Sequence, residues 1–234
     1  MREKKWKMLA GAAALALCWA VSGPNFMDNA WATDAGEAKA QAQSTSDLVR
    51  KGQVLFAENC VVCHQEGGVG KAGVAPSITN KELLRIASDQ FLFETIRDGR
   101  VDTPMPAFGE VLASKDDIHA LVAYLKSFRT GPDLSKDIEA DHISMGDPRL
   151  GKRWFEQVCA GCHGPRGEGY AGEGSGTAIG KPGFLGKASD GFIRYIVKNG
   201  RSNTAMRGFS GSYGLANLSD GEIDDIISYL RILE

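Results

Sequence analysis

The chain has 234 residues, of which 43% are hydrophobic and 24% charged, with a formal net charge of −2 and five cysteines. This length has room for about two domains of roughly 100 residues, each small for a self-sufficient hydrophobic core. The nearly balanced charge argues against an extended basic surface, so neither nucleic acid nor an anionic membrane surface is an expected partner.

Residues 1–32 have the pattern of an export signal. A basic start precedes an apolar stretch over 8–21, and Ala30-Trp31-Ala32 offers an A-x-A cleavage site. The apolar stretch is shorter than the ~20 residues that span a bilayer, which favours cleavage; an uncleaved membrane anchor is the alternative. Cleavage would remove Cys18 and leave four cysteines. Residues 33–46, rich in Ala, Gln, Ser and Thr, are predicted to form a flexible leader.

Residues 47–129 are predicted to form a helical domain that carries a cofactor. A first helix over about 48–59 leads into Cys60-Val61-Val62-Cys63-His64. In this C-x-x-C-H signature of c-type heme attachment, two thiols bond to the porphyrin and the His takes one axial face of the iron. A zinc site would need a second ligand pair to close one tetrahedron, and a thioredoxin-like pair would follow a strand of a βαβ unit. The sequence favours heme over both.

Two further helices are predicted in this domain, followed by a linker. One helix, over about 89–98, ends at Gly99, a residue typical of the position after a helix C-terminus. The other starts at Ser114 with a capping-box-like sequence, and its apolar residues recur at helical spacing as far as Leu125. Residues 130–145 carry four acidic side chains against one lysine and are predicted to be a polar surface linker.

Residues 146–234 repeat the first domain. A helix over about 148–158 leads into a second heme motif, Cys159-Ala160-Gly161-Cys162-His163, 99 residues after the first. Further helices are predicted over about 190–199 and from Ser219 onward. Beyond the motif, five residues recur at an offset of 101: Phe91, Gly99, Arg100, Met105 and Phe108 match Phe192, Gly200, Arg201, Met206 and Phe209.

This organisation resembles the class I cytochromes c over nearly the whole chain after residue 46. The resemblance implies an all-α fold of two tandem cytochrome c class I domains, each a small helical fold around a covalently bound heme. In each domain the terminal helices are expected to cross at a Gly and aromatic contact. The residues concerned are Gly52, Phe56 and Tyr124 in the first domain, and Gly151, Phe155 and Tyr229 in the second.

The resemblance also implies the cofactors and their ligands. Two covalently attached heme c groups are expected, with Met105 and Met206 as the second axial ligands and with the carbonyls of Pro76 and Pro182 as acceptors for the axial imidazoles. No catalytic residue is predicted. The predicted cofactor-binding residues are Cys60, Cys63, His64, Pro76, Met105, Cys159, Cys162, His163, Pro182 and Met206, of which His64, Met105, His163 and Met206 bind iron.

The function implied is one-electron transfer by an exported cytochrome, in the periplasm or at the outer face of the cytoplasmic membrane. By resemblance, its partners are a quinol-oxidising membrane complex, a terminal oxidase or reductase and small carriers, or the chain is itself a subunit of such a complex. The alternative is a diheme enzyme, either a peroxidase or a sulfur-compound-oxidising cytochrome, which would need a vacant axial position or a cysteine ligand. Because each domain has a candidate Met ligand, we expect an electron carrier without catalytic activity.

Overall fold

The computed structural model describes residues 29–212 and 214–234, and the side chains from residue 37 onward except that of residue 213. The predicted signal segment, including Cys18, lies outside the described residues as far as residue 28. The chain divides into two compact units, Met1–Gln41 and Ala42–Glu234, and the second contains both heme motifs. Within the described residues, the regular structure is helical, and β-pairing is limited to two isolated bridges. This confirms the all-α prediction.

The first helix is longer than predicted. α1 spans Asn29–Asn59 and so includes residues 33–46, for which the flexible leader was predicted. That prediction is wrong for the backbone. The reason is the run Glu-Ala-Lys-Ala-Gln-Ala-Gln at residues 37–43, in which every residue has high helix propensity.

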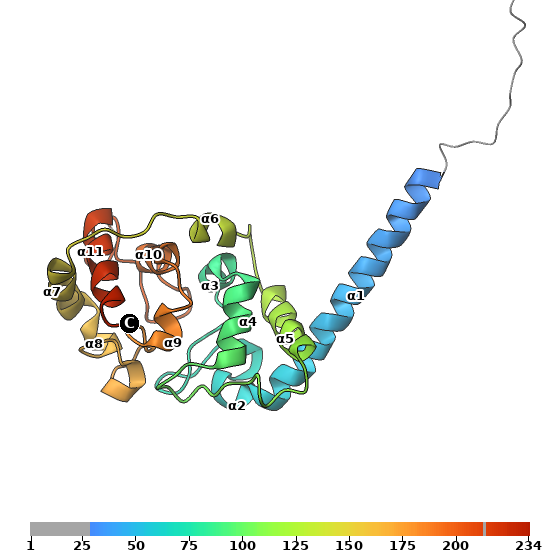
Figure 1. Ribbon diagram of the computed structural model, residues 1–234, viewed down its shortest axis with the longest axis horizontal. Coiled ribbons are helices and arrows are strands. Elements are labelled where there is room, and N and C mark those ends of the chain that lie inside the picture. The colour runs from blue at the N-terminus through green and yellow to red at the C-terminus, as the bar shows by residue number, and fades with distance from the viewer. Residues whose placement is uncertain (1–28, 213) are drawn as a thin grey trace, which may run out of the picture. The chain divides into compact units, whose positions relative to one another are not determined.

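The first heme motif contains one short helix, four helical elements follow it, and one more lies in the linker (Figure 1). These elements are α2 (Val61–His64), η1 (Glu66–Gly68), α3 (Lys81–Ile86), α4 (Asp89–Asp98), α5 (Lys115–Ser127) and α6 (Ser135–Glu139). The second domain has α7 (Pro148–Val158), α8 (Ala160–His163), η2 (Gly169–Gly172), α9 (Pro182–Leu185), α10 (Asp190–Asn199) and α11 (Asp220–Arg231). Both α4 and α10 begin at a serine whose hydroxyl accepts from the backbone N–H three residues on.

The terminal helices of each domain cross at a glycine, as the resemblance predicted. A Cβ added to Gly52 would lie 1.9 Å from the carbonyl oxygen of Ala120, and one added to Gly151 would lie 1.8 Å from that of Asp225. Only glycine allows the two backbones to approach so closely. Beside each glycine an aromatic pair fills the crossing, with ring centroids 5.3 Å apart for Phe56 and Tyr124 and 5.4 Å for the matching pair, Phe155 and Tyr229.

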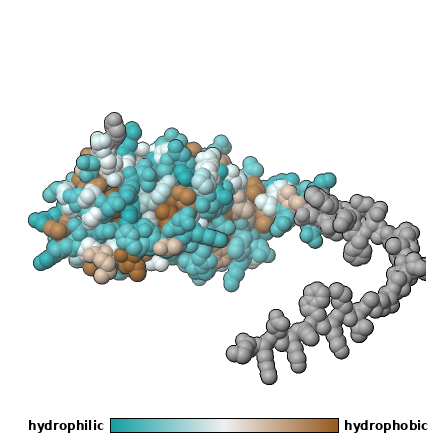
Figure 2. Space-filling model, turned by 90° about the horizontal axis from the view of Figure 1, so that it is seen from above, coloured by the Kyte–Doolittle hydropathy of each residue, from teal (hydrophilic) through white to brown (hydrophobic). Residues whose placement is uncertain are grey.

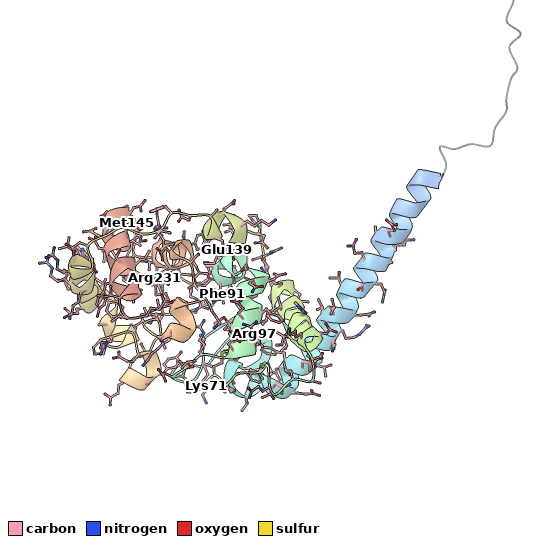
Figure 3. The ribbon with its side chains drawn as sticks, in the orientation of Figure 1. Lys71, Phe91, Arg97, Glu139, Met145 and Arg231 are labelled. Atoms are coloured by element: carbon pink, nitrogen blue, oxygen red, sulfur yellow. The ribbon has the colours of Figure 1, made fainter. Side chains whose placement is uncertain are left out.

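One hydrophobic core runs through both domains. Phe91 of α4, labelled in Figure 3, packs against Phe192 of α10 with ring centroids 4.7 Å apart. These two phenylalanines are repeat counterparts, so the same face of the same helix is used on both sides of the domain interface. The two domains therefore belong to one packed body between residues 42 and 234.

The linker is fixed to the second domain through a buried arginine. Arg194 on α10 is only 5% exposed. Its guanidinium bridges Asp141 in the linker, 2.5 Å away, and Asp224 on α11, 2.7 Å away. His142 also lies between these two carboxylates, which raise its pKa, Asp224 contributing most. The predicted surface linker is thus held by ion pairs along part of its length.

Candidate heme sites

The first heme motif folds into a single helical turn. The backbone N–H groups of Cys63 and His64 both donate to the carbonyl of Cys60, at 3.2 and 2.8 Å. Residues three apart on a helix share a face, so the two thiols point to the same side. Both cysteines are free thiols, and Val62 between them is 80% exposed. The edge of a heme attached here would lie close to the protein surface.

The second motif has the same geometry. The N–H groups of Cys162 and His163 donate to the carbonyl of Cys159, at 3.1 and 2.9 Å, and both cysteines are free. Burial, and then the neighbouring thiol, raise the pKa of Cys60 to about 11 and that of Cys159 to about 12.

The first axial imidazole is oriented by the carbonyl that the sequence analysis indicated. His64 is buried, and its Nδ1 donates to the carbonyl of Pro76 over 2.9 Å. Burial is the main cause that lowers the pKa of His64, and the charge of Arg100 adds to it. A neutral ring with Nδ1 committed in this way has only Nε2 left for iron.

The second imidazole uses a different acceptor, and the prediction for Pro182 is wrong. The Nδ1 of His163 donates over 2.7 Å to the carbonyl of Thr177, whereas the carbonyl of Pro182 accepts from the N–H of Gly186 within α9. The glycine-rich segment before Thr177 makes this possible: a Cβ on Gly176 would lie 2.9 Å from the His163 ring, so a glycine is needed for the close approach. A backbone carbonyl of any residue can accept this bond, so a proline is not required at the acceptor position.

Both candidate Met ligands lie on loops with one shared hydrogen-bonding scheme. In the first domain the N–H of Arg100 donates to the carbonyl of Met105 over 3.1 Å, and the Thr103 hydroxyl accepts from the Met105 N–H over 3.3 Å. In the second domain the corresponding bonds of Arg201, Thr204 and Met206 are 2.7 and 3.1 Å long. The two threonines recur at the repeat offset, so the sequence carried this signal although the prediction did not use it.

Two arginines that sequence reasoning matched as repeats, without giving them a role, lie near the histidines. Burial, with the charge of Arg201 as a lesser cause, lowers the pKa of Arg100 to about 10, and burial also lowers that of Arg201 to about 10. The charge of Arg201 likewise contributes to the lowered pKa of His163. Two partly buried positive charges beside the imidazoles suit a cofactor that bears carboxylates.

The residues present therefore fit heme c in both domains. Each domain offers two free thiols on one helical turn, an imidazole whose Nδ1 is already hydrogen-bonded, and a methionine on a hydrogen-bonded loop. Comparison with known proteins identifies cytochrome c-type domains in the same two parts of the chain. Residues 47–125 match the family model for cytochrome c oxidase, cbb3-type, subunit III, and residues 149–234 match the model for cytochrome c. The chain is a diheme c-type cytochrome.

Several relatives of this cytochrome are oxidase subunits. The cbb3-type cytochrome c oxidase subunit CcoP of Rubrivivax gelatinosus is 32% identical over 152 residues, which are 65% of this chain and 45% of the relative. The subunit FixP of Bradyrhizobium diazoefficiens is 39% identical over 82 residues, 35% of this chain and 28% of the relative. A solved structure, the Kuenenia stuttgartiensis reducing HAO-like protein complex Kustc0457/Kustc0458, has a TM-score of 0.44 and 20% identity, covering 78% of this chain and 95% of its own.

The chain spans less than half the length of these curated relatives. In the part of the chain that the structure describes, no helix has the combined length and hydropathy needed to cross a membrane.

Proposed function

We propose that this diheme cytochrome passes electrons one at a time to a terminal oxidase, as a subunit of it or as its donor, outside the cytoplasm. The observation that carries the proposal is the repeated donor set, in which each domain offers a fixed imidazole and a methionine loop. Similarity to cbb3-type oxidase subunits supports the choice of an oxidase as partner. The export pattern at residues 1–32 supports the location.

In this proposal the cysteines of each motif would hold the porphyrin, and His64 and His163 would bind iron through Nε2. Met105 and Met206 would supply the second protein ligand of each iron. When bound, the heme supplies a one-electron couple whose potential depends on the axial ligands and their hydrogen bonds. The carbonyls of Pro76 and Thr177 fix each ring and raise its basicity.

With two protein ligands on each iron, the protein would be an electron carrier without catalytic activity of its own. An enzyme that binds peroxide or oxygen needs an open or exchangeable position on iron, whereas two protein ligands restrict heme to electron transfer. The described surface is largely hydrophilic on the face shown in Figure 2, with hydrophobic residues in small groups. This suits brief docking over a small area, as is typical of redox partners.

A redox titration of the purified protein, followed by absorption and EPR, tests the ligand part of this proposal. Two low-spin His/Met signatures are expected, by EPR in the ferric protein and by absorption in both oxidation states. A high-spin component or ready cyanide binding would contradict it. Stopped-flow mixing of the reduced protein with an isolated cbb3-type oxidase tests the partner, and reoxidation no faster than with dioxygen alone would reject the oxidase.

A further inference from the structure

Arg201 reaches across the domain interface from the methionine loop of the second domain. Its Nη2 donates to the carbonyl of Ser77 over 2.5 Å, and its Nε lies 3.4 Å from the Oδ1 of Asn80. The next residue adds to this contact, because the N–H and the hydroxyl of Ser202 both donate to Glu82, at 2.8 and 2.6 Å. Residues 77–82 of the first domain are thus clamped by two consecutive residues of the second.

Residues 77–82 directly follow the residue that accepts the hydrogen bond of the first axial imidazole. Ser77 directly follows Pro76, whose carbonyl accepts from His64 Nδ1. Farther along the segment, buried Asn80 caps α3 by accepting from the N–H of Leu83 over 3.0 Å. The segment is therefore fixed by α3 at its far end and by Arg201 next to Pro76. The Pro76 and Ser77 carbonyls belong to adjacent peptide units joined at the Cα of Ser77, so a displacement of the Ser77 carbonyl would move the Pro76 carbonyl as well.

On its own side, Arg201 belongs to the loop that presents Met206. Its N–H donates to the Met206 carbonyl over 2.7 Å, and its own carbonyl accepts from the Thr204 hydroxyl over 2.7 Å. The repeat counterpart Arg100 uses its side chain differently, with its guanidinium carbon 5.0 Å from the ring centre of Phe184. The hydrogen-bonded link through Arg201 thus runs from the second domain to the first.

We propose that Arg201 is a positioning residue for His64, the axial imidazole of the other domain. By holding the Ser77 carbonyl, it keeps the Pro76 carbonyl against His64 Nδ1. A strong Nδ1–H bond makes the imidazole a more basic ligand, which favours oxidised iron and lowers the reduction potential. The second domain thereby sets part of the potential of the first heme. This inference rests on the proposed ligation by His64 and Met206.

The test is R201K in the full diheme protein, with R166K as a matched control because Arg166 is exposed in the same domain. Lysine keeps the positive charge, but its single ammonium group cannot reproduce the planar guanidinium that faces both the Ser77 carbonyl and Asn80. We expect the ratio of reduced to oxidised first heme at fixed ambient potential to rise about threefold, or about 28 mV for one electron. The second heme should change by less than half of that, and R166K should change neither.

A second measurement separates positioning from a general loss of structure. In the ferric protein, exchange of the His64 Nδ1–H, followed by NMR, should accelerate in R201K while that of His163 stays unchanged. S202A removes one of the two neighbouring donors without altering charge, and should shift the first heme in the same direction by a smaller amount. S202A is the deciding variant if R201K fails to bind heme.

The inference is overturned if R201K shifts only the second heme, shifts neither, or leaves His64 exchange unchanged. Failure of the proposed ligation is recognised separately, because it would appear in the spectra of the unsubstituted protein before any variant is made.

Discussion

The glycine at the helix crossing of the second domain makes a sharp stability prediction. In G151A the added Cβ would lie 1.8 Å from the carbonyl oxygen of Asp225. Real Cβ atoms essentially never come closer than 3.0 Å, so α7 and α11 must separate by about 1.2 Å. A gap of 0.5–1 Å already forfeits roughly a quarter to a half of the dispersion attraction between the atoms that it separates.

The size of the effect follows from the side chains packed there. Phe155 and Ile226 are 0% and 1% exposed at this crossing, and full burial of each contributes about 1.5–3 kcal/mol. Losing a quarter to a half of that contribution costs about 1–3 kcal/mol, from which the helix-propensity gain of about 0.5–1 kcal/mol for Ala over Gly is subtracted. We expect a net loss of about 1–2 kcal/mol in the free energy of unfolding. Because residues 42–234 form one packed body, the Tm should fall by about 2–8 °C.

The assay is thermal and guanidinium unfolding of the diheme protein, followed by helical circular dichroism. G221A is the matched control, because Gly221 lies on α11 with nothing within 4 Å of an added Cβ. It should be stabilising by about 0.4–1 kcal/mol, since Ala restricts the unfolded chain. The reasoning is refuted if G151A is as stable as the unsubstituted protein, or if the two variants shift the midpoint in the same direction.

M206H should lower the potential of one heme by about 59 mV or more, a tenfold change in its redox ratio, while M145H, at a position that is 90% exposed, should change neither potential in the same titration. R194M should cost about 3 kcal/mol in guanidinium unfolding, because two carboxylates lose their buried partner, whereas R149M, at a 90% exposed side chain, should leave the midpoint unchanged. His142 has a raised folded pKa, so its contribution is present below the unfolded pKa of about 6.5 and lost as pH rises through the folded value. H142Q should therefore flatten the fall in stability above pH 6.5, and an unchanged pH profile would exclude this contribution.

The helices that sequence reasoning placed well are those with strong terminal signals. The predicted ranges 89–98, 148–158 and 190–199 coincide with α4, α7 and α10, whose N-terminal capping residues are Ser88, Asp147 and Ser189. In each case the side chain of the capping residue accepts from a backbone N–H of the first turn. A cap is a local interaction within a few residues, so it can be recognised before the fold is known.

Shorter elements and contacts between domains were not predicted, for physical reasons. α3, α6 and α9 have four to six residues, too few to show a helical period. The acceptor for His163 is a main-chain carbonyl, which leaves no side-chain signature in the sequence. The reach of Arg201 to Ser77 depends on how the domains pack, and neither repeat alone contains that information.

The repeat explains why similar ligands need not give similar potentials. In the first domain the acceptor carbonyl belongs to a proline 12 residues after the histidine, and Arg201 of the other domain hydrogen-bonds the next residue. In the second domain the acceptor carbonyl follows a glycine-rich segment and lies 14 residues after the histidine. Glycine adds backbone freedom that proline removes, so the second imidazole depends on contacts within its own loop, including the close approach of Gly176. Duplication preserved the covalent attachment and the methionine loops, which are set by short local sequence. The surroundings of the two irons differ at the acceptor carbonyls and at the repeat arginines, because Arg201 hydrogen-bonds Ser77 whereas Arg100 lies over the ring of Phe184. These are the positions at which the two hemes can acquire different potentials.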